Sequence, residues 1–320
     1  MMKKLQVLVT GANGFLGGTL FRRLWRGNDF ECVGAVRSRP GIINGTDNMV
    51  TVGDMGAVIE WSSVVSGIEV VVHTAARAHI MNDEVADPLA EYRKVNVEGT
   101  LNLARQAAAA GVKRFIFISS IKVNGEQTVT GQPFFSRDAP SPEDFYGISK
   151  HEAEQGLRSL AAETGMEVVI IRPPLVYGLG VKGNFASMIK LVGKGLPLPL
   201  GAVHNQRSLV ALDNLFDLII TCIDHPGAAN ETFLVSDGED LSTTQLLQGV
   251  AEAMGKPSRL IPVPASLLQF GATLLGKKAL AQRLLGSLQV DISHTQKCLN
   301  WTPPLTVKQG LQRCFPNHQD

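Results

Sequence analysis

Short apolar runs alternate with amphipathic segments through the first half of the chain. The runs at 5–9, 30–36, 49–52, 69–73, 115–119 and 168–171 predict β-strands, and the segments at 15–26, 88–110 and 144–163 predict helices between them. The run at 69–73 is nearly all valine, which is typical of a parallel strand buried on both faces. This alternation predicts an α/β fold with a doubly wound parallel sheet and right-handed crossovers.

The pattern changes beyond Pro173. Segments such as 193–201 and 256–264 are rich in proline and glycine, and the predicted helices between them are short. We therefore expect a smaller C-terminal substrate-binding region over the carboxyl ends of the strands, where ligands of such sheets bind. The predicted division places residues 1–172 and 206–236 in one domain and residues 173–205 and 237–320 in the other.

The first strand leads into a turn with three glycines and then into a helix. Such a turn exposes backbone N–H groups at the positive end of a helix dipole, and these groups suit a pyrophosphate. The alternative is an ordinary strand-to-helix turn, but the order of strand, glycines and helix favours dinucleotide binding. The residues expected to bind the cofactor here are Gly11, Asn13, Gly14, Phe15, Leu16 and Gly17.

The end of the second strand bears on the choice between NAD and NADP. NAD-binding folds place an acidic residue there for the adenosine ribose, whereas this chain has Arg37. A guanidinium suits the 2′-phosphate of NADP, so Arg37 mildly favours NADP, with a solvated loop arginine as the alternative.

Residues after the third and fourth strands are expected to complete the cofactor site. Asp54, which precedes Met55, either accepts a hydrogen bond from adenine or caps a helix beginning near Ala57. After the valine-rich strand, small side chains leave room for the cofactor against the backbone. These small residues are Thr74, Ala75 and Ala76.

Composition narrows the possible partners. The 320 residues are 44% hydrophobic and 18% charged, with a net charge of +1 and no basic block, so we expect no nucleic-acid partner. No run approaches the roughly 18 apolar residues of a spanning helix, and the run after Lys4 is too short for a secretory signal. We therefore expect a cytoplasmic protein without membrane insertion. The four cysteines are widely spaced and predict no metal site.

Tyr146 and Lys150 stand four residues apart at the start of a predicted helix, so they face the same side. The lysine ammonium and an oxidised nicotinamide would together favour the phenolate of a tyrosine whose ordinary pKa is about 10, and lowering this pKa by about three units would correspond to roughly 4 kcal/mol. The phenolate could then shuttle a hydroxyl proton while the nicotinamide carries hydride. Alone, such a pair is common on protein surfaces.

Two further polar residues strengthen this interpretation. Ser120 follows the strand at 115–119, where its hydroxyl can polarise a substrate carbonyl next to Tyr146. Asn96, on the preceding helix, is expected to order a water beside Lys150 for proton relay. Together with the glycine turn, these residues occur in the order and on the elements that one oxidoreductase site requires.

These motifs resemble the extended short-chain dehydrogenases/reductases, and within them the nucleotide-sugar epimerases, dehydratases and 4-ketoreductases. The resemblance covers nearly the whole chain and implies an NAD(P)-binding Rossmann domain followed by a nucleotide-sugar-binding domain. It also implies a homodimer formed through a four-helix bundle of the helices that carry Asn96 and Tyr146. The matching strings are TGANGFLG from Thr10, NVEGTLNL from Asn96, FISS from Phe117, YGISK from Tyr146, IIRPPLVYG from Ile170, RSLVALDN from Arg207 and LNWTPPLTV from Leu299.

By position, the resemblance implies a catalytic set of Ser120, Tyr146 and Lys150 with Asn96 in support. It adds Pro173 to the cofactor site, together with Tyr146 and Lys150. For a UDP-sugar substrate it implies Ser120, His79, Asn184, Arg207 and Arg283, the two arginines binding the diphosphate. Asn184 as a helix cap and Arg283 as a solvated side chain remain alternatives.

Departures from the family pattern narrow the expected activity. Ile121 and Lys122 replace the acidic pair of the 4,6-dehydratases, which argues against elimination of water. Asn124 and Leu179 replace a usual tyrosine and proline and alter the expected shape of the sugar pocket.

The string SSIKVNGE, with RAH at 77–79, looks most like reductases of UDP-2-acetamido-2,6-dideoxy-4-hexulose, which serve bacterial surface polysaccharides such as the lipopolysaccharide O-antigen. We therefore expect NAD(P)-dependent reduction of a UDP-4-keto-6-deoxy-HexNAc. The alternatives are a UDP-glucose or UDP-GlcNAc 4-epimerase, a non-catalytic NADP-binding regulator, and a ketone reductase for a lipid or phenolic substrate.

Overall fold

The computed structural model describes residues 4–27, 29–38, 48–77, 86–181 and 183–316. The chain divides into two compact units, each built from separate stretches of sequence. The predicted division had residues 126–138, 206–218 and 234–236 in the first domain, whereas in the structure they cluster with the second unit. Unit 1 comprises Met1–Gly125, Ala139–Arg172 and Ile219–Phe233, and unit 2 comprises Glu126–Asp138, Pro173–Leu218 and Leu234–Asp320.

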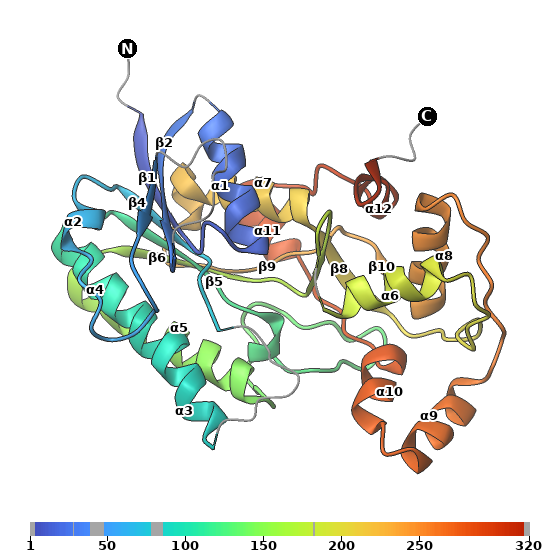
Figure 1. The fold of residues 1–320 in the computed structure, drawn as a ribbon. Helices are drawn as coiled ribbons and strands as arrows, with labels where there is room; N and C mark the ends of the chain where they lie inside the picture. Colours follow the sequence, from blue (N-terminus) through green and yellow to red (C-terminus); the bar gives the residue numbers. More distant parts are fainter. Residues whose placement is uncertain (1–3, 28, 39–47, 78–85, 182, 317–320) are drawn as a thin grey trace. The chain divides into compact units, whose positions relative to one another are not determined.

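A seven-stranded sheet of order β3-β2-β1-β4-β5-β6-β9 forms the centre of unit 1 (Figure 1). Strands β1 to β6 pair in parallel, which confirms the predicted doubly wound sheet. Each predicted strand forms, with ends shifted by one residue at most. The strands are β1 (Leu5–Thr10), β2 (Phe30–Val36), β3 (Met49–Thr51), β4 (Val70–His73), β5 (Arg114–Ile118), β6 (Glu167–Arg172) and β9 (Thr232–Leu234).

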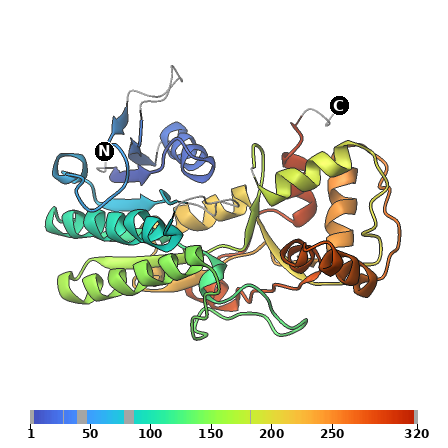
Figure 2. The same cartoon turned by 60° about the horizontal axis from the view of Figure 1, so that its bottom comes forward.

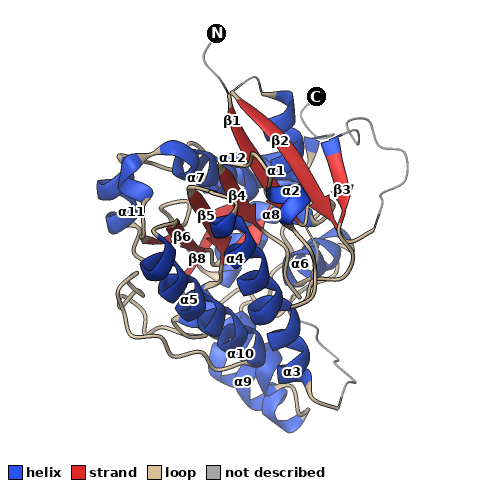
Figure 3. Cartoon of the chain, turned by 90° about the vertical axis from the view of Figure 1, so that its left-hand side faces the viewer, coloured by secondary structure: helices blue, strands red, loops and turns tan. Residues whose placement is uncertain are grey.

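Helices cover both faces of this sheet. α2 (Ser62–Val65), α4 (Thr100–Ala109) and α5 (Phe145–Thr164) bury one face, and α1 (Phe15–Arg26) lies on the other (Figures 1 and 3). Figure 2 shows α4 and α5 side by side. The core between these helices and the sheet is apolar, and its fully buried members include Trp61, Leu103, Phe115 and Leu157.

The segment predicted as one helix over 88–110 is divided in three. α3 (Pro88–Arg93) leads into a π-helical turn at Lys94–Gly99, labelled η2, and α4 follows. An apolar period of 3.6 residues does not reveal such a turn, which holds one extra residue.

Unit 2 is built around a smaller sheet of order β10-β8-β7, in which β8 pairs antiparallel with β10 and parallel with β7. Its apolar core includes Tyr177, Phe185, Leu209 and Val250.

No helix among the described residues has the length and apolar character needed to span a bilayer. The remaining elements of the described part of the chain are η3 (Ile121–Val123), β7 (Leu175–Tyr177), α6 (Asn184–Gly193), β8 (Arg207–Ala211), α7 (Leu212–Asp224), η4 (Pro226–Ala228), β10 (Asp240–Leu241), α8 (Thr243–Ala253), α9 (Ala265–Leu274), α10 (Lys278–Leu285), α11 (Ser293–Leu299) and α12 (Val307–Arg313).

Candidate functional site

The glycine turn lies where the strand order of the large sheet reverses. Thr10 at the end of β1 is paired with His73 at the end of β4, and ligands of doubly wound sheets bind at this point. Gly11 has φ +68°, a conformation that favours glycine. A Cβ on Gly17 would lie 2.3 Å from Thr74 Oγ1 and 2.4 Å from the Gly11 carbonyl oxygen. Glycine at both positions therefore has a steric reason in this structure.

The outer side of the turn presents backbone N–H groups. Asn13 and Gly14 are exposed, and Phe15 and Leu16 are half-buried in the first turn of α1. The Gly14 N–H donates to the Gly11 carbonyl at 2.8 Å, which keeps the turn tight. The open N-terminus of α1 has the form that a pyrophosphate requires, so these residues fit a dinucleotide.

The chain after β4 packs against the glycine turn. Thr74 Oγ1 donates to the Thr10 carbonyl at 2.6 Å, and the Ala75 N–H donates to Thr10 Oγ1 at 3.2 Å. Thr74, Ala75 and Ala76 are half-buried here. Small side chains thus border the turn, as predicted for a close approach of the cofactor.

Arg37 pairs with an acidic residue that the sequence did not connect to it. Its Nε lies 3.6 Å from Asp54 Oδ1, and both side chains are exposed. The alternative that Asp54 caps a helix near Ala57 is wrong, because the chain forms a turn there and α2 begins at Ser62. Met55 is half-buried against the core of unit 1.

Lys150 is buried beneath Tyr146 on α5. Its Nζ donates to the Ile118 carbonyl at 2.8 Å and lies 4.4 Å from the centroid of the Phe117 ring. The same Nζ is 5.9 Å from the centroid of the Tyr146 ring, and the ring of Tyr92 stands edge-on to Tyr146 at 6.2 Å. The structure therefore brings the tyrosine and lysine together beside the carboxyl end of β5.

Burial dominates the electrostatics of this pair in the chain alone. Burial, with Asp144 and Tyr92 nearby, raises the pKa of Tyr146, and the predicted lowering, which includes the charge of an oxidised nicotinamide, stays a prediction. Burial lowers the pKa of Lys150 to about 7, against the opposing charge of Glu154. Since the lysine is itself close to losing its proton at neutral pH, the chain's own groups supply little net positive charge to the phenol.

Ser120 is held close to the start of α5 by its neighbours. It is the N-cap of η3, where its Oγ accepts from the Lys122 N–H at 3.3 Å; a hydroxyl that accepts in this way keeps its proton to donate. Lys122 forms an ion pair with Asp144, the N-cap of α5. A Cβ on Gly147 would meet the Lys122 carbonyl at 2.8 Å, so this glycine permits the contact.

Asn96 lies in the π-helical turn and is fully buried. Its Nδ2 donates to Ser149 Oγ at 3.0 Å and to the Arg77 carbonyl at 3.1 Å, and its Oδ1 accepts from the Arg77 N–H at 2.8 Å. These bonds connect η2 to α5 and to the chain after β4. These bonds show that Asn96 holds the backbone at Arg77. That Asn96 orders a water beside Lys150 stays a prediction.

The sequence did not predict a buried hydrogen-bond network next to Lys150. Glu154 accepts from Arg172 Nε at 2.9 Å and from Arg172 Nη2 at 2.5 Å, and Ser119 Oγ donates to Glu154 at 2.5 Å. Arg172 Nη1 also donates to Asn124 Oδ1 at 2.9 Å. The spacing of Lys150 and Glu154, one helical turn apart, is the only local signal for it. Asn124, expected to shape the sugar pocket, belongs to this network.

The predicted substrate residues lie mainly in unit 2. Arg207 Nη1 donates to the carbonyls of Arg283 at 2.9 Å and Gly286 at 3.0 Å, so two arginines 76 positions apart in sequence come together. Burial lowers the pKa of Arg207. Asn184 begins α6, and Pro173, buried, directly follows β6. His79 lies outside the described residues.

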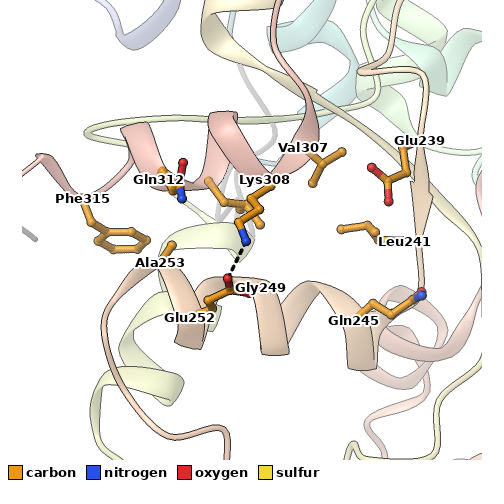
Figure 4. Close-up of a pocket in the computed structure, with 11 residues that line it drawn as sticks. Glu239, Leu241, Gln245, Gly249, Glu252, Ala253, Val307, Lys308, Gln312 and Phe315 are labelled. Carbon is orange, nitrogen blue, oxygen red and sulfur yellow. Dashed lines mark ion pairs between the residues drawn. The ribbon is translucent and has the colours of Figure 1, made fainter. Parts of the chain in front are cut away.

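A pocket of about 580 Å³ lies between α8 and α12 (Figure 4). Leu241, Val307 and Phe315 contribute apolar lining, and an ion pair of 2.8 Å joins Lys308 to Glu252. None of the predicted site residues is among the described residues that line this pocket. It is therefore separate from the candidate cofactor and substrate groups.

A parallel sheet with a glycine turn at its reversal point, and a tyrosine and lysine beside the end of β5, define an extended short-chain dehydrogenase/reductase. The chain belongs to the NAD dependent epimerase/dehydratase family, whose model matches residues 7–236. The predicted family and enzyme class are thereby confirmed.

Individual relatives extend over nearly the whole chain. A UDP-glucose 4-epimerase of Vibrio cholerae is 51% identical over 309 residues, covering 96% of this chain and 93% of the relative. An N-acetyl-alpha-D-glucosaminyl-diphospho-ditrans,octacis-undecaprenol 4-epimerase of Escherichia coli O157:H7 is 27% identical, covering 96% and 93%. The crystal structure of a Thermotoga maritima UDP-glucose 4-epimerase with UDP-glucose superposes with a TM-score of 0.76 at 22% identity, covering 97% of each chain, and supports the fold.

Proposed function

We propose that the protein is an NAD-dependent 4-epimerase of a UDP-sugar, with UDP-glucose and UDP-galactose as the first substrates to test. The observation that carries this proposal is 51% identity, across 96% of the chain, to a relative named UDP-glucose 4-epimerase. The 4-ketoreductase expected from the string at Ser119 is the weaker candidate, because that expectation rested on short local similarity. The retained Tyr146, Lys150 and Ser120 argue against a non-catalytic regulator.

Each candidate catalytic residue has a role in such a reaction. The glycine turn and Lys150 would hold NAD, which would supply reversible hydride transfer at C4 of the sugar without net oxidation. Tyr146 takes the proton of the C4 hydroxyl and gives it back, and the Ser120 hydroxyl donates to the same oxygen. Lys150, behind the tyrosine, supplies positive charge to the phenolate when it is protonated, and it offers a donor for ribose hydroxyls.

The raised pKa of Tyr146 makes proton removal depend on ligand charge. Burial and Asp144 favour the neutral phenol in the chain by itself. The positive charge of an oxidised nicotinamide would oppose both effects, as would a fully protonated Lys150. We infer that Tyr146 becomes a base only when oxidised cofactor is bound, which suits an enzyme that keeps its cofactor through the catalytic cycle.

For the cofactor we favour NAD over the predicted NADP. The carboxylate of Asp54 stands 3.6 Å from Arg37 and reduces the positive potential that a 2′-phosphate would meet. The same carboxylate would repel the phosphate and can accept hydrogen bonds from ribose hydroxyls. Identifying the nucleotide released from the purified, denatured protein tests this choice, and Asp54→Asn should improve NADP binding relative to NAD.

For the substrate diphosphate we propose Arg207 and Arg283, with Asn184 and His79 as further contacts. The Arg207 guanidinium is fixed by two carbonyl groups, so little side-chain entropy remains to be lost when it binds a diphosphate. Arg207→Lys keeps the charge but not the fork that matches phosphate oxygens. This variant should raise the KM for UDP-sugar and weaken UDP binding while cofactor content stays constant.

The decisive experiment incubates the protein with UDP-galactose and follows UDP-glucose by chromatography and nicotinamide absorbance at the same time. Conversion without net change in reduced cofactor is the expected result. Stoichiometric consumption of NADPH with a UDP-4-keto-6-deoxy-HexNAc, without conversion of UDP-galactose, UDP-glucose or UDP-GlcNAc, would establish the reductase instead.

A further inference from the structure

The hairpin of α9 and α10 exposes an apolar surface. α9 buries none of its residues. Leu267, Phe270 and Leu274 recur at positions i, i+3 and i+7 and are 59%, 62% and 72% exposed. In a surface helix such a stripe normally faces the core of its own protein. Here the stripe faces away from it, which indicates a contact outside the chain.

The turn between the two helices and the first residues of α10 continue this surface. Leu275 and Leu280 are 73% and 52% exposed, and the exposed Lys277 and Lys278 stand between them. Figure 1 shows α9 and α10 side by side with this turn joining them. Lysines can lay their methylene stems along an apolar layer while their ammonium groups reach a polar one. The tip of the hairpin therefore combines leucines with flanking ammonium groups.

The charge of this region has a single sign. The whole chain is nearly balanced, with 30 basic and 29 acidic residues, yet residues 253–290 contain neither Asp nor Glu. The partner of this surface must therefore be both anionic and able to take up apolar side chains. The basic residues of this stretch are Lys256, Arg259, Lys277, Lys278 and Arg283.

We propose that the α9–α10 hairpin docks the protein on the surface of an anionic lipid bilayer. The apolar stripe of α9 enters the boundary of the acyl chains, and Lys277 and Lys278 meet the headgroup phosphates. A bilayer fits better than a protein partner, because protein interfaces are enriched in Trp, Tyr and Arg, whereas leucine and lysine dominate here. Docking is peripheral and goes beyond the proposed function without depending on it.

This docking would bring the candidate diphosphate groups to the membrane surface. Arg283 lies in α10, and its carbonyl accepts from Arg207 Nη1 at 2.9 Å. Sugar diphosphates carried by a lipid, or made for transfer to one, are consumed at such a surface. The hairpin is thus a means of acting close to the next reaction.

Co-sedimentation of the full chain with lipid vesicles tests the proposal. We expect binding to vesicles of mixed phosphatidylglycerol and phosphatidylcholine, and much weaker binding to phosphatidylcholine alone. The double substitution Lys277→Gln/Lys278→Gln should weaken binding about thirty-fold, the effect of two interfacial lysines. Phe270→Ser/Leu274→Ser should weaken it at least tenfold, and should do so at high salt as well.

Matched variants at other exposed sites keep this test specific. The control variants are Lys297→Gln on α11 and Val58→Ser. Both residues are exposed, Val58 to 95%, and both variants should bind vesicles as the wild type does. The proposal fails if the protein does not bind phosphatidylglycerol vesicles or if the hairpin variants bind them normally. It fails as well if the control variants lose as much vesicle binding as the hairpin variants. It also fails if Phe270→Ser/Leu274→Ser separates a dimer into monomers, since a second copy would then cover the stripe. Should that variant misfold, the lysine pair, which lies at the exposed start of α10, gives the result alone.

Discussion

Glu154 and Arg172 form a bidentate ion pair of 2.5 and 2.9 Å with both side chains almost fully buried. The pair joins α5, one turn beyond Lys150, to the carboxyl end of β6. Removing one partner leaves the other charge buried without compensation, and this costs about 3–5 kcal/mol. We therefore predict that Glu154→Gln lowers the free energy of unfolding by about that amount, measured by urea denaturation.

A second variant separates charge burial from shape in this pair. Glu154→Met/Arg172→Leu removes both charges and should destabilise less than Glu154→Gln alone. Equal losses in the single and double variants would show that the destabilisation does not come from leaving the Arg172 charge without a partner.

Tyr146→Phe removes the hydroxyl proposed to carry the proton but keeps the ring against Tyr92. Turnover should fall by about 10²–10⁴, the usual contribution of a positioned acid–base group. Bound cofactor and thermal stability should stay close to those of the wild type. A Tyr146→Phe enzyme with normal turnover would exclude this tyrosine as the proton carrier.

Gly17→Ala tests the glycine turn. The added Cβ would lie 2.3 Å from Thr74 Oγ1 and 2.4 Å from the Gly11 carbonyl oxygen, so the turn must shift. We expect loss of bound dinucleotide, quantified after denaturation, and destabilisation of about 1–3 kcal/mol. Gly271→Ala is the matched control, because nothing lies within 4 Å of the Cβ that it would add; its cofactor content should be unchanged.

His73 should remain neutral well into the acid range. Burial and the charge of Lys150 lower its pKa from 6.5 to about 3. Between these values the unfolded chain binds a proton that the folded chain does not, so this group makes stability fall as the pH drops from 6.5 toward 3. Two-dimensional NMR of the imidazole groups as a function of pH measures the pKa of His73, and titration of His73 near 6.5 would contradict the prediction.

The homodimer remains a prediction from the family resemblance. α4 and α5 lie side by side, and Leu101, Ala108 and Ala161 on them are only half-buried in the single chain. Pairing with the same two helices of a second copy would cover such side chains. Sedimentation velocity should give twice the 34.4 kDa of one chain, and a species of that single mass at micromolar concentration would oppose a stable dimer.

The parts of the structure that the sequence predicted are those with a local signal. The strands of unit 1 and the turn at Gly11 follow from apolar runs and from glycine at fixed intervals. The pairing of Arg37 with Asp54 and of Glu154 with Arg172 joins residues from different elements, which no local pattern records. The effect of burial on the pKa values of Tyr146 and Lys150 is likewise a property of the fold, and no local pattern records it.

The turn at Lys94–Gly99 has a consequence for how this chain can vary. A π-turn takes up its extra residue in about the rotation that an α-helix spans with one residue fewer. Deleting one residue there would therefore restore ordinary helical winding and leave α3 and α4 facing as they do now. What such a deletion would change is the position of Asn96 within the turn, and with it the bonds of its amide to Ser149 and to the Arg77 backbone.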